Sequence, residues 1–334
     1  MSKPGIGIIG AGGIVETNHL PAICILPQVE VKWVYDKNPA RMELLSRMYS
    51  IPVLSGKDVE KGLDEVDICL LATPYGVRKS YVEFCREKGK ALVVEKPFAF
   101  SGAEHAANCA GFSEWQIAVN LQRRFYRSAA TLRSIVEKNL FGRLREVRFS
   151  QGHFSLKGGS GYLSDVRLAG GGVIAESAIH SLDLILWISA AQSVAVREMH
   201  ALYERGLDYD ASFVSDLYCG ENIIKAFCEI STLRNLENGL QLQFEQATVC
   251  CDLSPDCPIY IKGSGGEQLD FTLSPQPVPG PLSGGARKIN EAFLLFWRLF
   301  LSGMESRTAN MTSAGSSLLT SAWIGEIYKS MQGS

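Results

Sequence analysis

Three acid–base side chains stand in an otherwise apolar segment, AGGGVIAESAIHSLDLILWI at 169–188. Glu176, His180 and Asp183 are spaced i, i+4 and i+7, so a helix presents them on one face. Polar groups in so apolar a helix need partners or a ligand. A lone core histidine is more often structural, but one flanked by two carboxylates is better explained as an oriented acid–base group. We predict an acid–base role for His180, an orienting or hydrogen-bonding role at the same site for Glu176, and a helix-tethering role for Asp183.

A lysine follows a wholly apolar run in VVEKP at 93–97. The run indicates a buried strand, and the proline stops further pairing, so Lys96 is expected to project from the carboxyl edge of a sheet into a cleft. A partly desolvated lysine there can act as proton donor, acceptor or electrostatic clamp. The alternative is an ordinary surface lysine, which the apolar strand disfavours.

A glycine-rich turn follows the first predicted strand in GIIGAGGIVE. Gly10 permits the tight turn, and Gly12 lets the backbone approach a pyrophosphate seated at a helix N-terminus. The third position of the G-x-G-x-x-G/A pattern is Val15, which predicts a slightly displaced helix rather than lost binding. The position of this turn, with an acid at the end of the second predicted strand, makes the dinucleotide interpretation specific.

That acid is Asp36, 21 residues after Val15. Its carboxylate can accept hydrogen bonds from ribose hydroxyls and repel a 2′-phosphate, which favours NAD. Lys37 and Arg41 could instead pair with a 2′-phosphate, so NADP is the alternative. Thr73 and Pro74 end another apolar strand and should line the cofactor cleft, with a simple strand-ending turn as the alternative. The predicted cofactor-binding residues are Gly10, Gly12, Gly13, Ile14, Asp36, Lys37, Thr73, Pro74, Glu95 and Lys96.

The elements that must position these residues change character along the chain. From residue 5 to about 120, short β-branched runs alternate with stretches of helical spacing, and uncharged runs at 68–72 and 91–94 suit strands buried on both faces. This pattern predicts an α/β fold with a doubly wound parallel sheet. The pattern of residues 192–273 indicates successive strands without intervening helices, which predicts an antiparallel sheet. We expect domains at 1–122 and 123–334, with a last helix near 312–331 packing back near the first domain.

Composition bounds the function classes. The 334 residues suggest two domains, and 33 Lys plus Arg against 35 Asp plus Glu argue against a nucleic-acid surface. The apolar run 292–301 is too short for a membrane span, and the N-terminus lacks a signal peptide's apolar core. Nine cysteines without zinc-site spacing predict reduced thiols and no metal. We expect a cytoplasmic protein without nucleic-acid or membrane partners.

Several motifs occur in a fixed order over essentially the whole chain. They are the strand–GAGG–helix opening, Asp36, ATP at 72–74, Glu95-Lys96-Pro97, NLQRRF at 120–125, and GGG-x-x-x-E-x-A-x-H-x-x-D from Gly170 to Asp183. With these motifs the chain resembles the glucose–fructose oxidoreductase/inositol dehydrogenase (Gfo/Idh/MocA) family. The family's helix acid is usually Asp where this chain has Glu176, and the family often has His where this chain has Arg78.

The resemblance implies an N-terminal Rossmann domain and a C-terminal α/β domain on an open, mainly antiparallel sheet. It implies hydride transfer between a nicotinamide and a carbinol or ketone, often of a sugar, cyclitol or sugar nucleotide. The family's lysine, helix acid and histidine correspond to Lys96, Glu176 and His180. It also points to sheet-to-sheet dimers or tetramers, for which the segments 225–230 and 241–244 carry apolar residues.

Our leading hypothesis is an NAD(P)-dependent oxidoreductase acting on a polyhydroxylated small molecule. His180 would remove the hydroxyl proton as hydride leaves for the nicotinamide, Glu176 would orient the site, and Lys96 would hold the reacting oxygen or exchange the proton itself. Arginines 123, 124 and 127 could recognise a carboxylate or phosphate, or pair with surface acids. The predicted substrate-binding residues are Arg124, His153, Tyr162, Glu176 and His180.

Two other functions are alternative hypotheses. One is a dinucleotide-binding sensor without turnover, because this fold can bind a cofactor without catalysis. The other is an imine or double-bond reductase on the same scaffold.

The glycine-rich segment 155–169, which contains Tyr162, is expected to close over the substrate as a lid. The alternative is a surface loop that connects two elements without contacting the substrate.

Overall fold

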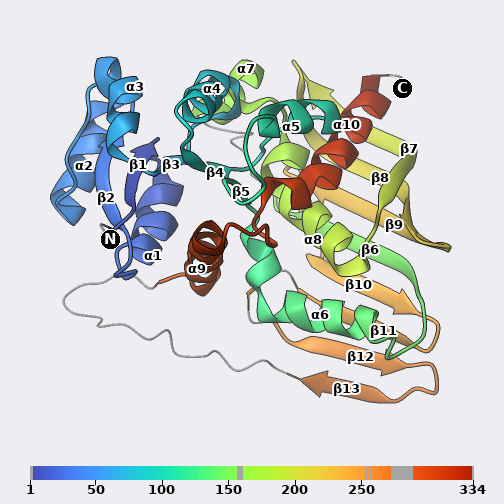
Figure 1. Ribbon diagram of the computed structural model, residues 1–334. Helices are drawn as coiled ribbons and strands as arrows, with labels where there is room; N and C mark the ends of the chain where they lie inside the picture. The colour runs from blue at the N-terminus through green and yellow to red at the C-terminus, as the bar shows by residue number, and fades with distance from the viewer. Residues whose placement is uncertain (1–2, 156–160, 253, 256, 272–288, 333–334) are drawn as a thin grey trace. The chain divides into compact units, whose positions relative to one another are not determined.

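The computed structural model describes residues 3–155, 161–252, 254–255, 257–271 and 289–332 (Figure 1). The chain forms two compact units. The first comprises Met1–Phe98, Ala106–Asn120 and Pro277–Ser316, and the second comprises Ala99–His105, Leu121–Gln276 and Ser317–Ser334. The first unit therefore includes a segment from beyond the boundary that we expected near residue 122, and the second unit includes Ala99–His105 from before it.

The first unit is built on a five-stranded parallel sheet with strand order β2-β1-β3-β4-β5. Every residue of β1, β3, β4 and β5 is buried, as expected of strands covered on both faces. The order reverses between β1 and β3, and ligands of such sheets bind at the carboxyl ends of the strands beside this switch point. The strands are β1 (Gly5–Ile9), β2 (Glu30–Tyr35), β3 (Ile68–Leu71), β4 (Ala91–Glu95) and β5 (Ile117–Asn120).

Helices from distant parts of the chain complete the first unit. The side chain of Asn290 accepts a hydrogen bond from the backbone N–H of Ala292 and so caps helix α9 (Glu291–Ser306). This helix contacts α1, and its buried side includes Trp297. The remaining helices are α1 (Leu20–Ile23), α2 (Pro39–Tyr49), α3 (Val59–Gly62) and α4 (Lys79–Glu87), while α5 (Gly102–Cys109) runs across the division between the units.

The second unit is built on an eight-stranded sheet with strand order β13-β12-β11-β10-β6-β9-β8-β7. Neighbours pair antiparallel except β6 with β9, which confirms the expected mainly antiparallel sheet. The strands are β6 (Leu144–Gly152), β7 (Ser193–Glu204), β8 (Leu207–Cys219), β9 (Asn222–Ser231), β10 (Gly239–Phe244), β11 (Ala247–Cys251), β12 (Ile259–Gly263) and β13 (Gln268–Phe271).

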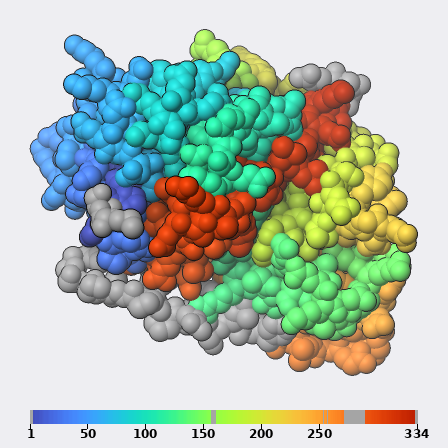
Figure 2. Space-filling model, viewed as in Figure 1, coloured from blue at the N-terminus to red at the C-terminus, as the bar shows by residue number. Residues whose placement is uncertain are grey.

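Helices α6 (Arg127–Glu137), α8 (Ile179–Ser189) and α10 (Leu318–Gln332) cover one face of this sheet (Figure 1). Helix α10 packs within the second unit against β7 and α8, and its red surface lies beside yellow-green surface in Figure 2. It also contacts Phe100 and His105, which lie in the expected first domain 1–122 but belong to the second unit. The indole N–H of Trp323 anchors it by donating to Ser215 Oγ at 3.0 Å.

The helical stretch Val166–Ser189 is long and apolar enough to cross a membrane by length and composition. Within its most apolar window, 72% of the residues are buried inside the protein. Such burial is typical of a core helix that covers a sheet, so the apolar character of this stretch is explained by packing.

Candidate active site

The glycine turn after β1 has the geometry of a phosphate-binding loop. Gly10 has φ of 104°, and a Cβ there would lie 2.4 Å from the carbonyl oxygen of Ala72 at the end of β3. Both constraints exclude a side chain. A Cβ at Gly12 or Gly13 would meet no atom within 4 Å, so open space lies before their backbone. Val15 is fully buried, and the following helix starts with a π-turn (Val15–His19).

Asp36 lies directly against this turn. Its Oδ2 accepts a hydrogen bond from the backbone N–H of Ala11 at 2.7 Å, and its Oδ1 accepts one from Asn38 N–H at 2.8 Å. Arg41, considered above as a partner for a 2′-phosphate, donates to Ala11 O and forms an ion pair with Glu16 at 2.7 Å. The acid is therefore fixed at the cofactor edge, and the nearby arginine already has a carboxylate partner.

The residues at the switch point fit a dinucleotide. Thr73, at the end of β3, has a buried Oγ1 without a hydrogen-bond partner among the described residues, which is unusual for a buried hydroxyl. Its backbone nitrogen lies 3.1 Å from the position of a Cβ on Gly10. An unsatisfied hydroxyl beside an open glycine cradle matches what a pyrophosphate or nicotinamide requires. Among the residues that the structure describes, no group of three or more His, Cys, Asp or Glu side chains could hold a metal ion.

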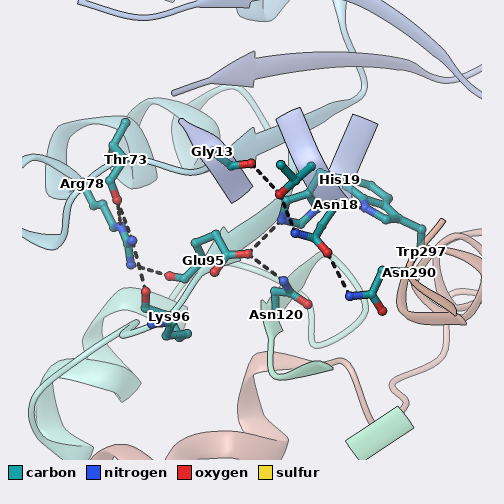
Figure 3. A network of polar contacts seen from close by, with 11 residues as sticks. Gly13, Asn18, His19, Thr73, Arg78, Glu95, Lys96, Asn120, Asn290 and Trp297 are labelled. Atoms are coloured by element: carbon teal, nitrogen blue, oxygen red, sulfur yellow. Dashed lines mark hydrogen bonds and ion pairs between the residues drawn. The ribbon is translucent and has the colours of Figure 1, made fainter. Parts of the chain in front are cut away.

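Lys96 follows directly on a buried polar network around Glu95 (Figure 3). His19 lies 2.8 Å from Glu95 Oε1, which also accepts a hydrogen bond from Asn120 at 2.6 Å. The indole N–H of Trp297 donates to His19 Nδ1 at 3.0 Å, so Nε2 carries the proton donated to Glu95. Burial acts to raise the pKa of Glu95, but these hydrogen bonds and the charge of Lys96 outweigh burial and lower it. Glu95 is thus a buried carboxylate that fixes the end of β4.

Arg78 holds the same segment by its backbone (Figure 3). Its guanidinium donates to Thr73 O at 2.5 and 2.8 Å, to Glu95 O, to Pro97 O at 2.5 Å and, at 3.4 Å, to Lys96 O. The arginine therefore ties the ends of β3 and β4 together around Lys96. In the sequence, Arg78 differs from the family pattern, but nothing near it predicts its role. The carbonyl groups that it binds lie up to 19 residues away along the chain.

In the second unit, Asp208 caps the helical segment that carries the predicted acid–base residues. Its Oδ1 accepts hydrogen bonds from Gly172 N–H and Tyr328 Oη at 2.7 Å, and its Oδ2 accepts one from Ile174 N–H at 2.8 Å. A Cβ on Gly172 would lie 1.9 Å from Asp208 O, and one on Gly171 would lie 2.1 Å from Tyr328 Oη. Close approach therefore requires both glycines. Sequence reasoning missed Asp208 and Tyr328.

Glu176 lies in a π-turn (Ile174–Ala178) that leads into α8. Such turns are frequent at functional sites. The π-turn changes the ideal i, i+4 relation that the sequence suggested between Glu176 and His180. The His180 residue is 9% exposed. A cavity of about 90 Å³ opens at this turn. It is lined by Leu163, Gly171, Gly172, Val173, Glu176, Ser177, Leu207, Asp208, Tyr209 and Thr232.

Asp183 tethers its helix, as predicted, and Arg124 is its partner. The two form a buried bidentate ion pair with distances of 2.7 and 2.5 Å, and Thr320 donates to the same carboxylate at 2.8 Å. Arg124 was predicted to bind substrate; its guanidinium is instead 4% exposed and held by Asp183, which corrects that assignment. Arg123 differs, because its Nη1 donates to the hydroxyl of Ser181 at 2.6 Å.

The other predicted substrate residues lie at the surface of the second unit. His153 is exposed, and its backbone N–H donates to Ser231 O at 3.2 Å. Tyr162 is 42% exposed, in a short turn (Gly161–Ser164). Residues 156–160 of the expected lid lie outside the described residues. Lys96 belongs to the first unit, whereas Glu176 and His180 belong to the second.

A switch-point glycine turn, an acid at the end of β2 and a second unit on a mainly antiparallel sheet define the class of two-unit Rossmann dinucleotide-binding proteins. The chain belongs to the Gfo/Idh/MocA family. Residues 5–119 match the model of the family's N-terminal domain, an oxidoreductase family with an NAD-binding Rossmann fold. Residues 129–253 match the model of the family's C-terminal domain. The cofactor of the first unit is therefore of the NAD type.

Individual relatives are distant. The chain is 28% identical to the rhizopine catabolism protein MocA of Rhizobium meliloti over 59% of its own length and 61% of the relative's. It is 24% identical to human trans-1,2-dihydrobenzene-1,2-diol dehydrogenase over 90% of its own length and 89% of the relative's. The structure of aldose–aldose oxidoreductase from Caulobacter crescentus superposes with a TM-score of 0.83 at 18% identity, covering 99% of this chain and 98% of that one. The last comparison establishes the fold.

Proposed function

We propose that this protein is an NAD(P)-dependent oxidoreductase that transfers hydride between nicotinamide and a carbinol or ketone carbon of a sugar, cyclitol or nucleotide-linked sugar. The observation that carries the proposal is the position of Lys96. It follows β4 at the carboxyl edge of the sheet that also carries the glycine turn and Thr73, and Glu95 and Arg78 fix its backbone. A lysine whose backbone is held at a cofactor edge suits a reaction that develops negative charge on oxygen.

NAD is the proposed preferred cofactor. Asp36 lies where ribose hydroxyls are bound in this fold, and its carboxylate repels a 2′-phosphate. The guanidinium of Arg41 is already paired with Glu16. Lys37 is exposed next to Asp36 and is the remaining cation through which NADP would be accepted.

The bound nicotinamide supplies the hydride acceptor for oxidation and the donor for reduction. In the oxidation direction, His180 takes the hydroxyl proton and Lys96 stabilises the oxygen that loses it. Glu176, at the cavity of the second unit, hydrogen-bonds a neighbouring substrate hydroxyl. A proton transfer through Lys96 itself is the alternative assignment.

Relatives support a CH–OH substrate. The human relative is named as a dehydrogenase of a diol, and the Caulobacter neighbour as an oxidoreductase of aldoses. An imine or double-bond reductase would also use a proton donor near the nicotinamide, but it would leave polyols unchanged. A sensor would bind the dinucleotide without turnover.

The test is turnover by the purified full chain with NAD⁺ or NADP⁺ against cyclitols, free sugars and nucleotide sugars, followed by the absorbance of the reduced nicotinamide. Lys96→Ala and His180→Ala should each lower kcat/KM by about 100-fold or more. Lys88→Ala, which removes a surface lysine paired with Asp64, is the matched control. Full turnover in the first two variants would refute the assignment, and cofactor binding without any turnover would favour the sensor.

We also propose a homodimer or homotetramer formed through the second sheet. The face opposite α8 and α10 carries an open depression of about 710 Å³, with Phe227 and Tyr260 among its lining residues. Within the described part of the chain this sheet face is open, and aromatic residues on an open face favour association. A monomeric mass by light scattering at micromolar concentration would refute association through this face.

We further propose a cytoplasmic location. All nine cysteines are free, as is typical of proteins in a reducing compartment.

A further inference from the structure

Arg123 is a half-buried cation whose partners are both neutral. It lies in the turn Gln122–Phe125, where its Nη1 donates to Ser181 Oγ at 2.6 Å and its guanidinium also hydrogen-bonds the hydroxyl of Tyr126. Among the residues that the structure describes, no carboxylate pairs with it. The adjacent Arg124 is fully neutralised by Asp183, so two neighbouring arginines have opposite electrostatic situations.

A desolvated cation without a counter-charge is costly. Burial lowers the pKa of Arg123, and the hydroxyl of Tyr126 offsets this only in part. Hydroxyl groups orient a guanidinium but do not neutralise it. A guanidinium has five N–H donors, and two hydroxyl partners leave donors for a further ligand. Uncompensated charges of this kind are candidate functional groups, because an anionic ligand removes the electrostatic cost.

The position of Arg123 links it to the predicted acid–base helix. Ser181, its hydroxyl partner, directly follows His180 in α8. Ser181 also follows, by four residues in the sequence, Ser177, which lines the 90 Å³ cavity together with Glu176. The guanidinium is therefore anchored to the same helix that carries the proposed proton-transfer residues.

We propose that the substrate carries an anionic group, a carboxylate or a phosphate, and that Arg123 binds it. This inference deepens the proposed function and rests on it: the reacting molecule is a polyhydroxylated acid or a phosphorylated or nucleotide-linked sugar rather than a neutral polyol. Oxygen pairs of carboxylates and phosphates match the planar fork of a guanidinium, and such charge-assisted hydrogen bonds are strong. Arg123 is then a specificity-determining residue, and Arg124 holds the helix in place.

The experiment compares matched ligand pairs by calorimetric binding in the presence of NAD⁺. D-galacturonate is paired with D-galactose to probe a carboxylate, and D-glucose 6-phosphate with D-glucose to probe a phosphate. The full-length protein should bind one of the anionic members at least about 10-fold more tightly than its neutral partner. Arg123→Gln should abolish that difference, and Arg123→Lys should retain part of it because the charge remains. Arg47→Gln, which removes an exposed arginine paired with Glu43, is the control and should change nothing.

Equal binding of anionic and neutral members by the wild type, or an unchanged anion preference in Arg123→Gln, would overturn the inference. Ser181→Ala provides a second variant that keeps the charge and removes the hydroxyl tether. It should weaken anion binding by roughly 3- to 10-fold, in line with one lost hydrogen bond, and leave the neutral sugars unaffected. An unchanged anion affinity in this variant would contradict the anchoring by α8.

Binding and turnover separate the two proposals. Turnover of neutral sugars without any anion preference would leave the proposed oxidoreductase function standing and refute the role of Arg123. An Arg123-dependent anion preference without turnover of any ligand would support the anion site and refute the redox function.

Discussion

Replacement of Asp208 by Asn tests whether this buried carboxylate holds the acid–base helix in place. The two carboxylate oxygens together accept three hydrogen bonds, two from backbone N–H groups at Gly172 and Ile174 and one from Tyr328. An amide keeps the size of the side chain but has only one oxygen. Whichever way the amide of Asp208→Asn turns, its NH₂ faces a backbone donor, so at least one buried N–H loses its acceptor.

The expected magnitude follows from these contacts. Asp208 is 2% exposed, so the abandoned N–H is not rescued by bulk water and costs about 1–3 kcal/mol. Loss of a negative charge at a helix N-terminus adds about 0.5–1 kcal/mol. We therefore expect Asp208→Asn to lower the free energy of unfolding by roughly 2–4 kcal/mol. Tyr328→Phe removes one hydrogen bond but leaves both backbone donors satisfied, so it should cost about 1 kcal/mol.

Urea unfolding of the single variants and of the double variant measures these values. Because Asp208 and Tyr328 are in contact, the double variant should lose less than the sum of the two single losses, by at least about 0.5 kcal/mol. Both single variants should also lower kcat, since the helical segment they hold carries Glu176. Asp58→Asn, at an exposed position, is the control and should stay within about 0.5 kcal/mol of wild type. The same small change for Asp208→Asn would show that the cap does not hold the helix.

Four further substitutions test other parts of the structure. Asp36→Ala should lower the ratio of kcat/KM with NAD⁺ to that with NADP⁺ by about 10-fold or more, and a wild type that already prefers NADP would contradict the role of Asp36. The pKa of Glu95 is lowered from 4.5, so its carboxylate contributes stability above about pH 4.5 and loses that contribution as the pH falls through the folded-state value. Glu95→Gln should remove this part of the acid sensitivity, and an unchanged slope of unfolding free energy against pH would refute it. Arg124→Gln leaves Asp183 buried without its ion-pair partner and should cost about 3–5 kcal/mol in urea unfolding, whereas Arg123→Gln should cost less than about 1 kcal/mol. Equal losses would contradict the different roles of the two arginines.

Local patterns were sufficient for the parallel sheet and its cofactor edge. Buried strands such as β3 and β4 appear as uninterrupted apolar runs because both of their faces are covered. Gly10 is specified by its own backbone, since a φ of 104° is strained for any residue with a side chain. Asp36 was found because the end of the second strand must lie beside the first turn in this fold. Each of these features depends on interactions within a strand, a turn or a neighbouring strand.

The segments that complete each unit were less predictable. Helix α9 begins at Glu291, yet it packs against α1 in the first unit, while α10 belongs to the second. The apolar pattern of a helix shows that one face is buried but does not specify what covers it. The pattern of the two last helices therefore did not show that α9 completes one unit and α10 the other.

The sequence by itself determined the fold class, the dinucleotide motif and the apolar helix with Glu176 and His180, because these follow from residue type and short-range spacing. Only the tertiary structure decided that Asp208 and Tyr328 hold that helix, and that Arg78 ties β3 to β4. It also decided that Arg124 is neutralised while Arg123 is not, although the two arginines are adjacent in the chain. The physical reason is that a charge or a donor is satisfied by whatever lies within about 3 Å of it in space. For Arg124 that partner is 59 residues away, and for Asp208 the hydroxyl of Tyr328 is 120 residues away.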